Sequence, residues 1–143
     1  MVYPAVKDSV TVPSGTPDKT LFVSVGESFG KDLKDLQTGK TVSLEDCARG
    51  YWREKDLSDS HAYDCEWLMA TVHGAVVGVW KIDRNRGWLR SRTNPISTRP
   101  VPNEPPPRMV CEVIPVEDAV WNRFVGCEVH LGRHFNPLRG YFY

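Results

Sequence analysis

The sequence has no long apolar run and no closely spaced pair of cysteines. Its longest apolar run has the length of a short strand, far below the ~18 residues of a membrane-spanning helix, so we expect a soluble protein with no membrane partner. The four cysteines, at positions 47, 65, 111 and 127, include no C-x-x-C motif, and the N-terminus shows no basic and then apolar signal pattern. These absences predict a protein of the reducing cytoplasm.

The motifs of common enzyme classes are missing as well. The chain contains no H-E-x-x-H, no G-x-S-x-G and no P-loop, and no Gly-rich phosphate fingerprint follows its first apolar run. Its later acids, Glu112, Glu117, Asp118 and Glu128, do not form an evident nuclease cluster. We therefore expect no cofactor and favour a function without catalysis, although a Cys and His pair that meets only in space would leave no motif.

Net charge is also absent, since 18 basic residues balance 18 acidic ones, but the charges are unevenly distributed. Residues 1–66 carry 8 Lys and Arg against 12 Asp and Glu, a net charge of −4, and residues 67–143 carry 10 against 6, a net charge of +4. Nine of the ten cations in the second half are Arg, whose planar guanidinium suits phosphates and guanine edges. The second half is therefore the candidate for a nucleic-acid surface, and the alternative is a mixed, solvated surface.

The composition predicts a single domain. A chain of 143 residues with 41% hydrophobic and 25% charged residues can bury a core of its own. Residues 1–20 are rich in Pro and small polar residues and are expected to form an N-terminal arm, followed by one domain at 21–143. Six of the eleven prolines lie between residues 94 and 107, which predicts a Pro-rich loop inside that domain.

Residues 67–72 and 75–82 give the clearest structural pattern, two apolar runs joined by His73 and Gly74. This spacing predicts a β-hairpin. Alternation along its second strand predicts two faces, one with Val76, Gly78, Trp80 and Ile82 and the other with Val77, Val79 and Lys81.

Other apolar patterns predict strands at 21–25 and 109–114 and short helices at 43–48, 56–66 and 117–124. Strands and short helices mixed in this way indicate an α+β fold. We expect a curled, mainly antiparallel sheet or pseudo-barrel with flanking helices. A Rossmann arrangement is not expected, because the chain lacks long crossover helices.

The segment from Lys81 to Arg99 carries the strongest functional signal. It has one acid, Asp83, and six cations, which are Lys81, Arg84, Arg86, Arg90, Arg92 and Arg99. Trp80 precedes it and Trp88 lies within it, beside Gly87. Cations neutralise phosphates, and an exposed Trp offers a flat face for an unstacked base. The segment thus predicts a nucleic-acid-binding surface with Trp88 as the exposed ring, and the alternative is a solvated hairpin end with Trp80 in the core.

Arg49 and Trp52 form a second cluster of cation and aromatic side chains, at the expected end of a helix in Ala48-Arg49-Gly50-Tyr51-Trp52-Arg53. Such a pair could line a pocket. The structural alternative is that Trp52 closes the end of the barrel and Arg49 pairs with a carboxylate.

The order of several short motifs resembles a small bacterial or phage domain of the PUA-like kind, in the grouping of EVE, ASCH and YTH domains. The matching pieces are 48–52, 67–72, 76–82, Trp88, 126–129 and 136–141. The resemblance implies a pseudo-barrel that binds nucleic acid, in several relatives by taking a modified base into an aromatic-lined pocket. By position it assigns Arg49, Trp52 and Asn136 to that pocket, whereas Asn136 before Pro137 also suits a turn. The N-terminal arm and the Pro-rich loop depart from the family.

Cys127, His130 and His134 have C-x-x-H-x-x-x-H spacing, which would suit three zinc ligands on a helix or a tight loop. Gly132 does not favour that local structure, so ordinary packed or surface side chains are the preferred interpretation.

The favoured hypothesis is a domain that binds DNA or RNA and holds a modified or flipped base in an aromatic-lined pocket. One alternative is a small hydrolase or nuclease that uses the Cys127, His130 and His134 side chains. The other is a module that docks a protein partner through the Pro-rich loop and exposed aromatic rings.

Overall fold

The computed structural model describes residues 11–25, 44–50, 52–91, 108–131 and 138–142. The strands in these ranges are β1 (Thr20–Ser24), β2 (Trp67–Val72), β3 (Ala75–Ile82), β4 (Trp88–Ser91), β5 (Arg108–Cys111), β6 (Val113–Pro115) and β7 (Leu138–Tyr141). The helices are α2 (Leu44–Arg49), α3 (Glu54–Asp59) and α4 (Asp118–Phe124), and a 3₁₀ turn, η3 (Ala62–Asp64), follows α3. This mixture confirms the expected α+β class. In the same ranges no helix is long and apolar enough to cross a membrane.

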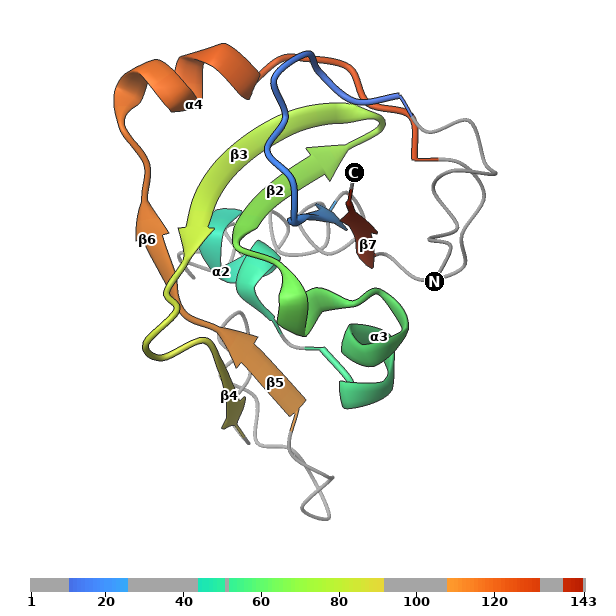
Figure 1. Cartoon of the computed structure of the whole chain (residues 1–143), viewed down its shortest axis with the longest axis vertical. Helices are drawn as coiled ribbons and strands as arrows, with labels where there is room; N and C mark the ends of the chain where they lie inside the picture. The colour runs from blue at the N-terminus through green and yellow to red at the C-terminus, as the bar shows by residue number, and fades with distance from the viewer. Residues whose placement is uncertain (1–10, 26–43, 51, 92–107, 132–137, 143) are drawn as a thin grey trace, which may run out of the picture.

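Five of these strands form one open sheet in the order β6-β3-β2-β1-β7 (Figure 1). β1 is parallel to β2, and the other neighbouring strands are antiparallel, so the sheet is mixed. β6 and β7 occupy the two edges, and the described strands do not close into a barrel. β4 and β5 pair with each other in a separate two-stranded ribbon.

The β2–β3 hairpin has the predicted bounds and the predicted turn. His73 and Gly74 both have positive φ, 48° and 79°, as a two-residue turn that follows the twist of its strands requires. Gly adopts a positive φ without steric cost, which is why Gly74 between two apolar runs predicted the turn correctly.

The faces of β3 differ from the simple alternation expected. A register shift between Ala70 and Thr71 pairs them with Gly78 and Val76, so β3 has one extra residue there, Val77. A bulge of this kind moves all following side chains to the opposite face. Val76 therefore lies with Val79 in one cluster of buried side chains, and Trp80 and Ile82 lie in another. The expected grouping of Val76 with Trp80 and Ile82 was wrong.

Two elements that the sequence predicted as continuous are divided. The strand expected at 109–114 breaks at Glu112, and its halves join different sheets, β5 with β4 and β6 with β3. The helix expected at 56–66 begins earlier, at Glu54, and ends before His61, whose φ of 58° cannot continue a helix.

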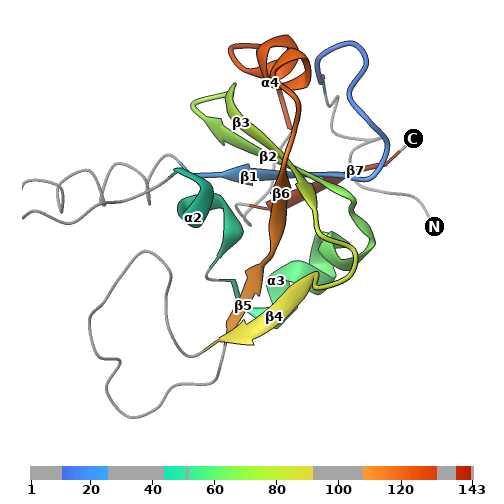
Figure 2. The same cartoon turned by 90° about the vertical axis from the view of Figure 1, so that its left-hand side faces the viewer.

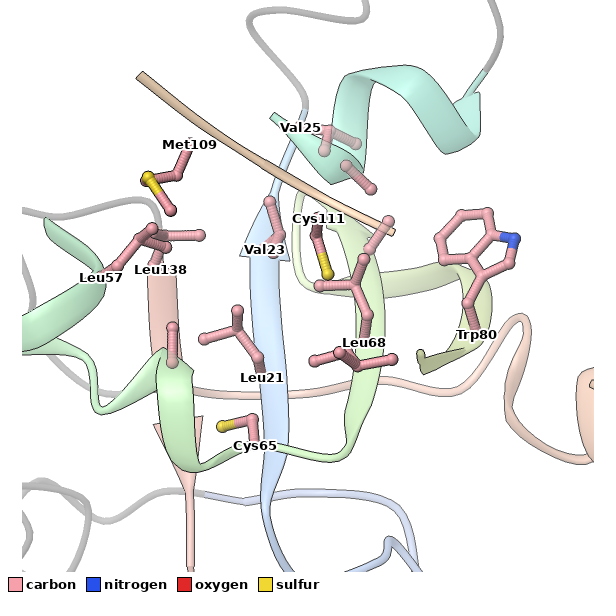
Figure 3. Close-up of a cluster of buried hydrophobic side chains, with 14 residues drawn as sticks. Leu21, Val23, Val25, Leu57, Cys65, Leu68, Trp80, Met109, Cys111 and Leu138 are labelled. Carbon is pink, nitrogen blue, oxygen red and sulfur yellow. The ribbon is translucent and has the colours of Figure 1, made fainter. Parts of the chain in front are cut away.

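Both faces of the sheet are covered (Figure 2). α4 covers one face, where Phe124 packs with Phe22, Met69, Val76 and Val79. α2, α3 and the β4–β5 ribbon lie on the other side of the sheet. The larger cluster of buried side chains, drawn in Figure 3, lies between them and the sheet. Side chains of β1 on both faces are fully buried, including Leu21, Phe22 and Val23. The larger cluster fixes the ribbon and η3 against the sheet, and the candidate site lies at their junction.

Candidate nucleic-acid interface

The chain between β3 and β4 makes a tight turn over residues 83–87, and Asp83 organises it. Its Oδ1 accepts hydrogen bonds from the backbone N–H groups of Asn85, at 2.9 Å, and Arg86, at 3.3 Å. Its carbonyl oxygen accepts the N–H of Gly87, which has a φ of 56°. The single acid of the cation-rich segment is therefore a structural residue that fixes where Arg84 and Arg86 emerge.

A hollow of about 260 Å³ opens beside this turn, between η3, the end of β3 and the start of β4. Its lining residues come from 63–65 and from 82–88, and they are Tyr63, Cys65, Ile82, Asp83, Arg84, Gly87 and Trp88. The hollow thus combines aromatic rings, an apolar floor, a carboxylate and a guanidinium. Small-ligand sites likewise combine aromatic and apolar side chains with a few polar groups.

Tyr63 and Trp88 supply the aromatic part of the wall. Their rings meet edge to face, with centroids 6.4 Å apart and planes at 78°. Tyr63 is 44% exposed, and partial burial raises the pKa of its hydroxyl above the usual value. Trp88 is mostly buried, and its indole Nε1 is buried without a hydrogen-bond partner in the described part of the chain. The sequence predicted Trp88 as the exposed ring, but Tyr63 is the more exposed of the two.

The cations in and near the hollow differ in the contacts that they already make with the rest of the protein. Arg84 makes one long hydrogen bond, from Nη1 to the carbonyl oxygen of Cys65 at 3.4 Å. Arg86 is exposed and forms no ion pair within the described ranges. Lys81 is exposed, with its Nζ 5.4 Å from the ring centroid of Trp67. Arg90 lies 2.8 Å from Glu54 in an exposed ion pair, which contributes little to stability.

Arg49 and Trp52 lie outside this hollow and have structural contacts. Arg49 donates from Nε to the carbonyl oxygen of Cys111 at 2.7 Å, and its Nη2 lies 3.5 Å from a carboxylate oxygen of Glu112. Trp52 donates from Nε1 to the carbonyl oxygen of Ala48 at 3.2 Å and packs against the larger core cluster. The Glu112 contact agrees with the structural alternative for Arg49, and Trp52 packs in the core, although the described strands form no barrel for it to close. Arg92, Arg99 and Asn136 lie outside the described residues.

Cys65 lines the hollow but is not a reactive group. Burial, the largest cause, and then neighbouring acids raise the pKa of its thiol far above the usual value, and the side chain is only 1% exposed. Burial also raises the pKa of Cys111 to about 12. Protonated, buried thiols are poor nucleophiles, so neither thiol supports covalent catalysis.

The second cysteine and histidine cluster does not form a metal site among the residues described. The thiol of Cys127 lies 3.3 Å from the carbonyl oxygen of Arg123, and the backbone of His130 pairs with Thr11. His134 lies outside the described ranges, within which no three His, Cys, Asp or Glu side chains gather as metal ligands.

Comparison with known proteins gives no relative from which a function could be transferred. No family model matches the chain, and neither a curated protein nor a solved structure matches it. The functional argument therefore depends on the chemistry of the site itself.

Proposed function

We propose that this chain is a nucleic-acid-binding domain that holds one base in the hollow beside Tyr63 and Trp88. The observation that carries the proposal is the aromatic wall and the guanidinium of Arg84 in one hollow. An aromatic face that stacks on a base contributes roughly 1–3 kcal/mol and accepts any base. Arg84 would bind the phosphate next to the captured base.

The size of the hollow supports a single base as its occupant. Its volume of about 260 Å³ equals that of roughly nine waters at ~30 Å³ each. The bonded atoms of a pyrimidine or purine ring system take up less room than the same number of separate waters, so the hollow is large enough for one base. In the proposed arrangement the sugar and phosphate stay at its mouth, beside the cations.

The cations outside the hollow suit a phosphate backbone. Arg84 and Arg86 emerge from the same turn, and the exposed Lys81 lies at the end of β3 that leads into it. If these three neutralise three phosphates of a single strand, the logarithm of the binding constant should fall by about 2 for each tenfold rise in salt.

The finer family assignment is also part of this proposal. The strand-rich α+β architecture and the order of the short motifs support a distant relation to PUA-like domains. In this assignment the base is held at the β3–β4 turn and not near Arg49 and Trp52, since the Arg49 side chain joins α2 to β5 and the Trp52 side chain bonds Ala48 of α2.

The test is a fluorescence-anisotropy titration with labelled single-stranded DNA and RNA 12-mers over a range of salt concentrations. The Arg84→Ala, Arg86→Ala double variant should bind all sequences more weakly and reduce the salt slope by about 1.4. Arg123→Ala is the control for removing a cation, because Arg123 belongs to α4 at the opposite end of the molecule from β4 (Figure 1). Absence of binding to every oligonucleotide at low salt would refute the proposal.

A further inference from the structure

Of the two oxygens of the Asp83 carboxylate, one accepts hydrogen bonds in the described part of the chain and the other does not. Both side-chain hydrogen bonds that fix the turn end on Oδ1. Its other oxygen, Oδ2, has no partner in the described part of the chain, nor is it among the buried polar atoms that lack one. Asp83 also lines the hollow. The lining therefore includes a carboxylate that the turn holds in place and that keeps one oxygen for a further hydrogen bond.

An ionised carboxylate only accepts hydrogen bonds, so the edge of a ligand beside it must donate. Among the bases, cytosine, adenine and guanine carry an exocyclic amino group that can donate. Uracil and thymine have no amino group, and the one donor on that edge, the ring N3–H, lies between two carbonyl oxygens that would face the carboxylate with like partial charge. Acidic side chains that read bases accept from the N4 amino group of cytosine for this reason.

We propose that Asp83 selects bases with an exocyclic amino group and discriminates against uracil and thymine. This inference rests on the proposed function, since it assigns a specificity to the same hollow. In the proposed function Arg84 binds the neighbouring phosphate, and its Nη1 already donates to the carbonyl oxygen of Cys65. The indole N–H of Trp88 is buried. Asp83 supplies the carboxylate among the lining residues, and a carboxylate accepts where a guanidinium or an indole N–H donates.

Asp83→Asn is the matched variant. The amide oxygen of Asn can still accept the two backbone N–H groups, so the turn at 83–87 is kept. In Asn an NH₂ group, which donates, replaces the acceptor Oδ2, so the edge of a ligand beside it must accept a hydrogen bond and not donate one. The variant also removes a negative charge and should strengthen binding to all oligonucleotides. The ratio of two affinities is therefore the informative quantity.

The experiment compares single-stranded dC and dU 12-mers, whose bases differ in the amino or carbonyl group at C4 and in whether the neighbouring N3 carries a hydrogen. A hydrogen bond to a charged group corresponds to about a tenfold or larger change in affinity. The wild-type protein should prefer dC by about that factor, and Asp83→Asn should abolish or invert the preference. An oligonucleotide of N4,N4-dimethylcytosine, which has no amino hydrogen, should bind the wild-type protein as weakly as dU does and requires no variant to fold.

The outcomes separate this inference from the proposed function. Equal, salt-dependent binding of dC and dU to the wild-type protein overturns the role of Asp83 and leaves the nucleic-acid function standing. A dC preference that persists in Asp83→Asn or with dimethylcytosine also overturns it. If neither oligonucleotide binds, both proposals fail.

Discussion

In the proposed site Tyr63 is the ring available to stack on a base, because it is 44% exposed while Trp88 is mostly buried. Tyr63→Ala should weaken the binding of single-stranded oligonucleotides by about 1–3 kcal/mol, the usual loss when a stacking ring is removed. Tyr63→Phe keeps the ring and should bind within twofold of the wild type. Anisotropy titration at one salt concentration measures both, and equal affinity of Tyr63→Ala and the wild type would place the base elsewhere.

Tyr63 also shows the limit of prediction from sequence at the residue scale. It is a lone aromatic residue in the polar stretch 56–66, and nothing local distinguishes it from a surface ring. It becomes a candidate only because η3 brings it to Trp88, 25 positions away in the chain. Arg49 and Trp52 show the opposite case, since a local pattern of cation and aromatic side chains suggested a pocket and the contacts found for both are structural.

The buried thiol of Cys65 makes stability depend on alkaline pH. Because burial raises its pKa in the folded state, the unfolded thiol loses its proton first, at a pKa of about 8.5. This contribution is complete below that pH and is lost as pH rises, by up to about 1.4 kcal/mol for each pH unit. Urea unfolding at pH 8, 9 and 10 should therefore show a shallower decline for Cys65→Ala than for the wild type. Parallel curves would show that the thiol is not protected in the native state.

At the scale of elements, the sequence predicted the β2–β3 hairpin well because its signals are local. Two apolar runs and a turn with Gly at the second position leave few alternatives. The continuous strand expected at 109–114 failed for the opposite reason. Its halves are separated by the choice of pairing partner, β4 for one and β3 for the other, and that choice is tertiary. The alternation of residues along β3 did not predict the bulge at Val77 either, because the bulge depends on the register with β2.

The hairpin turn allows a test with two substitutions of opposite sign. Gly74→Ala forces a Cβ into a φ of 79° and places it 3.3 Å from the carbonyl oxygen of Val129, so it should destabilise the protein by about 1 kcal/mol. His73→Asn relieves a residue held at a φ of 48° and creates the preferred Asn-Gly turn, so it should stabilise by a few tenths of a kcal/mol. Urea unfolding of both variants would contradict this account of the turn if the signs were reversed.

For the whole molecule, the charge division along the sequence is not a division in space. β1, from the acidic half, lies between β2 and β7 from the basic half. Arg90 pairs with Glu54, and Arg49 lies beside Glu112, so ion pairs join the two halves. Arg84, which lines the hollow, and Arg86 in the same turn form no ion pair within the described ranges, and neither does Lys81 at the end of β3. In the proposed function a phosphate backbone would therefore meet a few cations at fixed positions and not a surface made by the whole basic half of the sequence.

Under the proposed function, this limited charge predicts a preference for one form of nucleic acid. A hollow that holds one base requires that base to leave its stack, which in a duplex costs a few kcal/mol for unpairing and unstacking. Three cations are too few to compensate that cost by binding additional phosphates. A single strand should therefore bind at least tenfold more tightly than a fully paired duplex of the same sequence.

A duplex with one cytosine opposite an abasic site provides the decisive comparison. The orphan cytosine has no pairing partner, so the free energy needed to flip it is smaller than for a paired base. The affinity of the protein for this duplex should lie between its affinities for the paired duplex and for the single strand. The Tyr63→Ala variant should bind it only as weakly as the paired duplex. Competition titration against one labelled single strand measures all three on one scale. Equal affinity for the paired and the orphan-cytosine duplex would mean that binding is to the phosphate backbone alone and that no base enters the hollow.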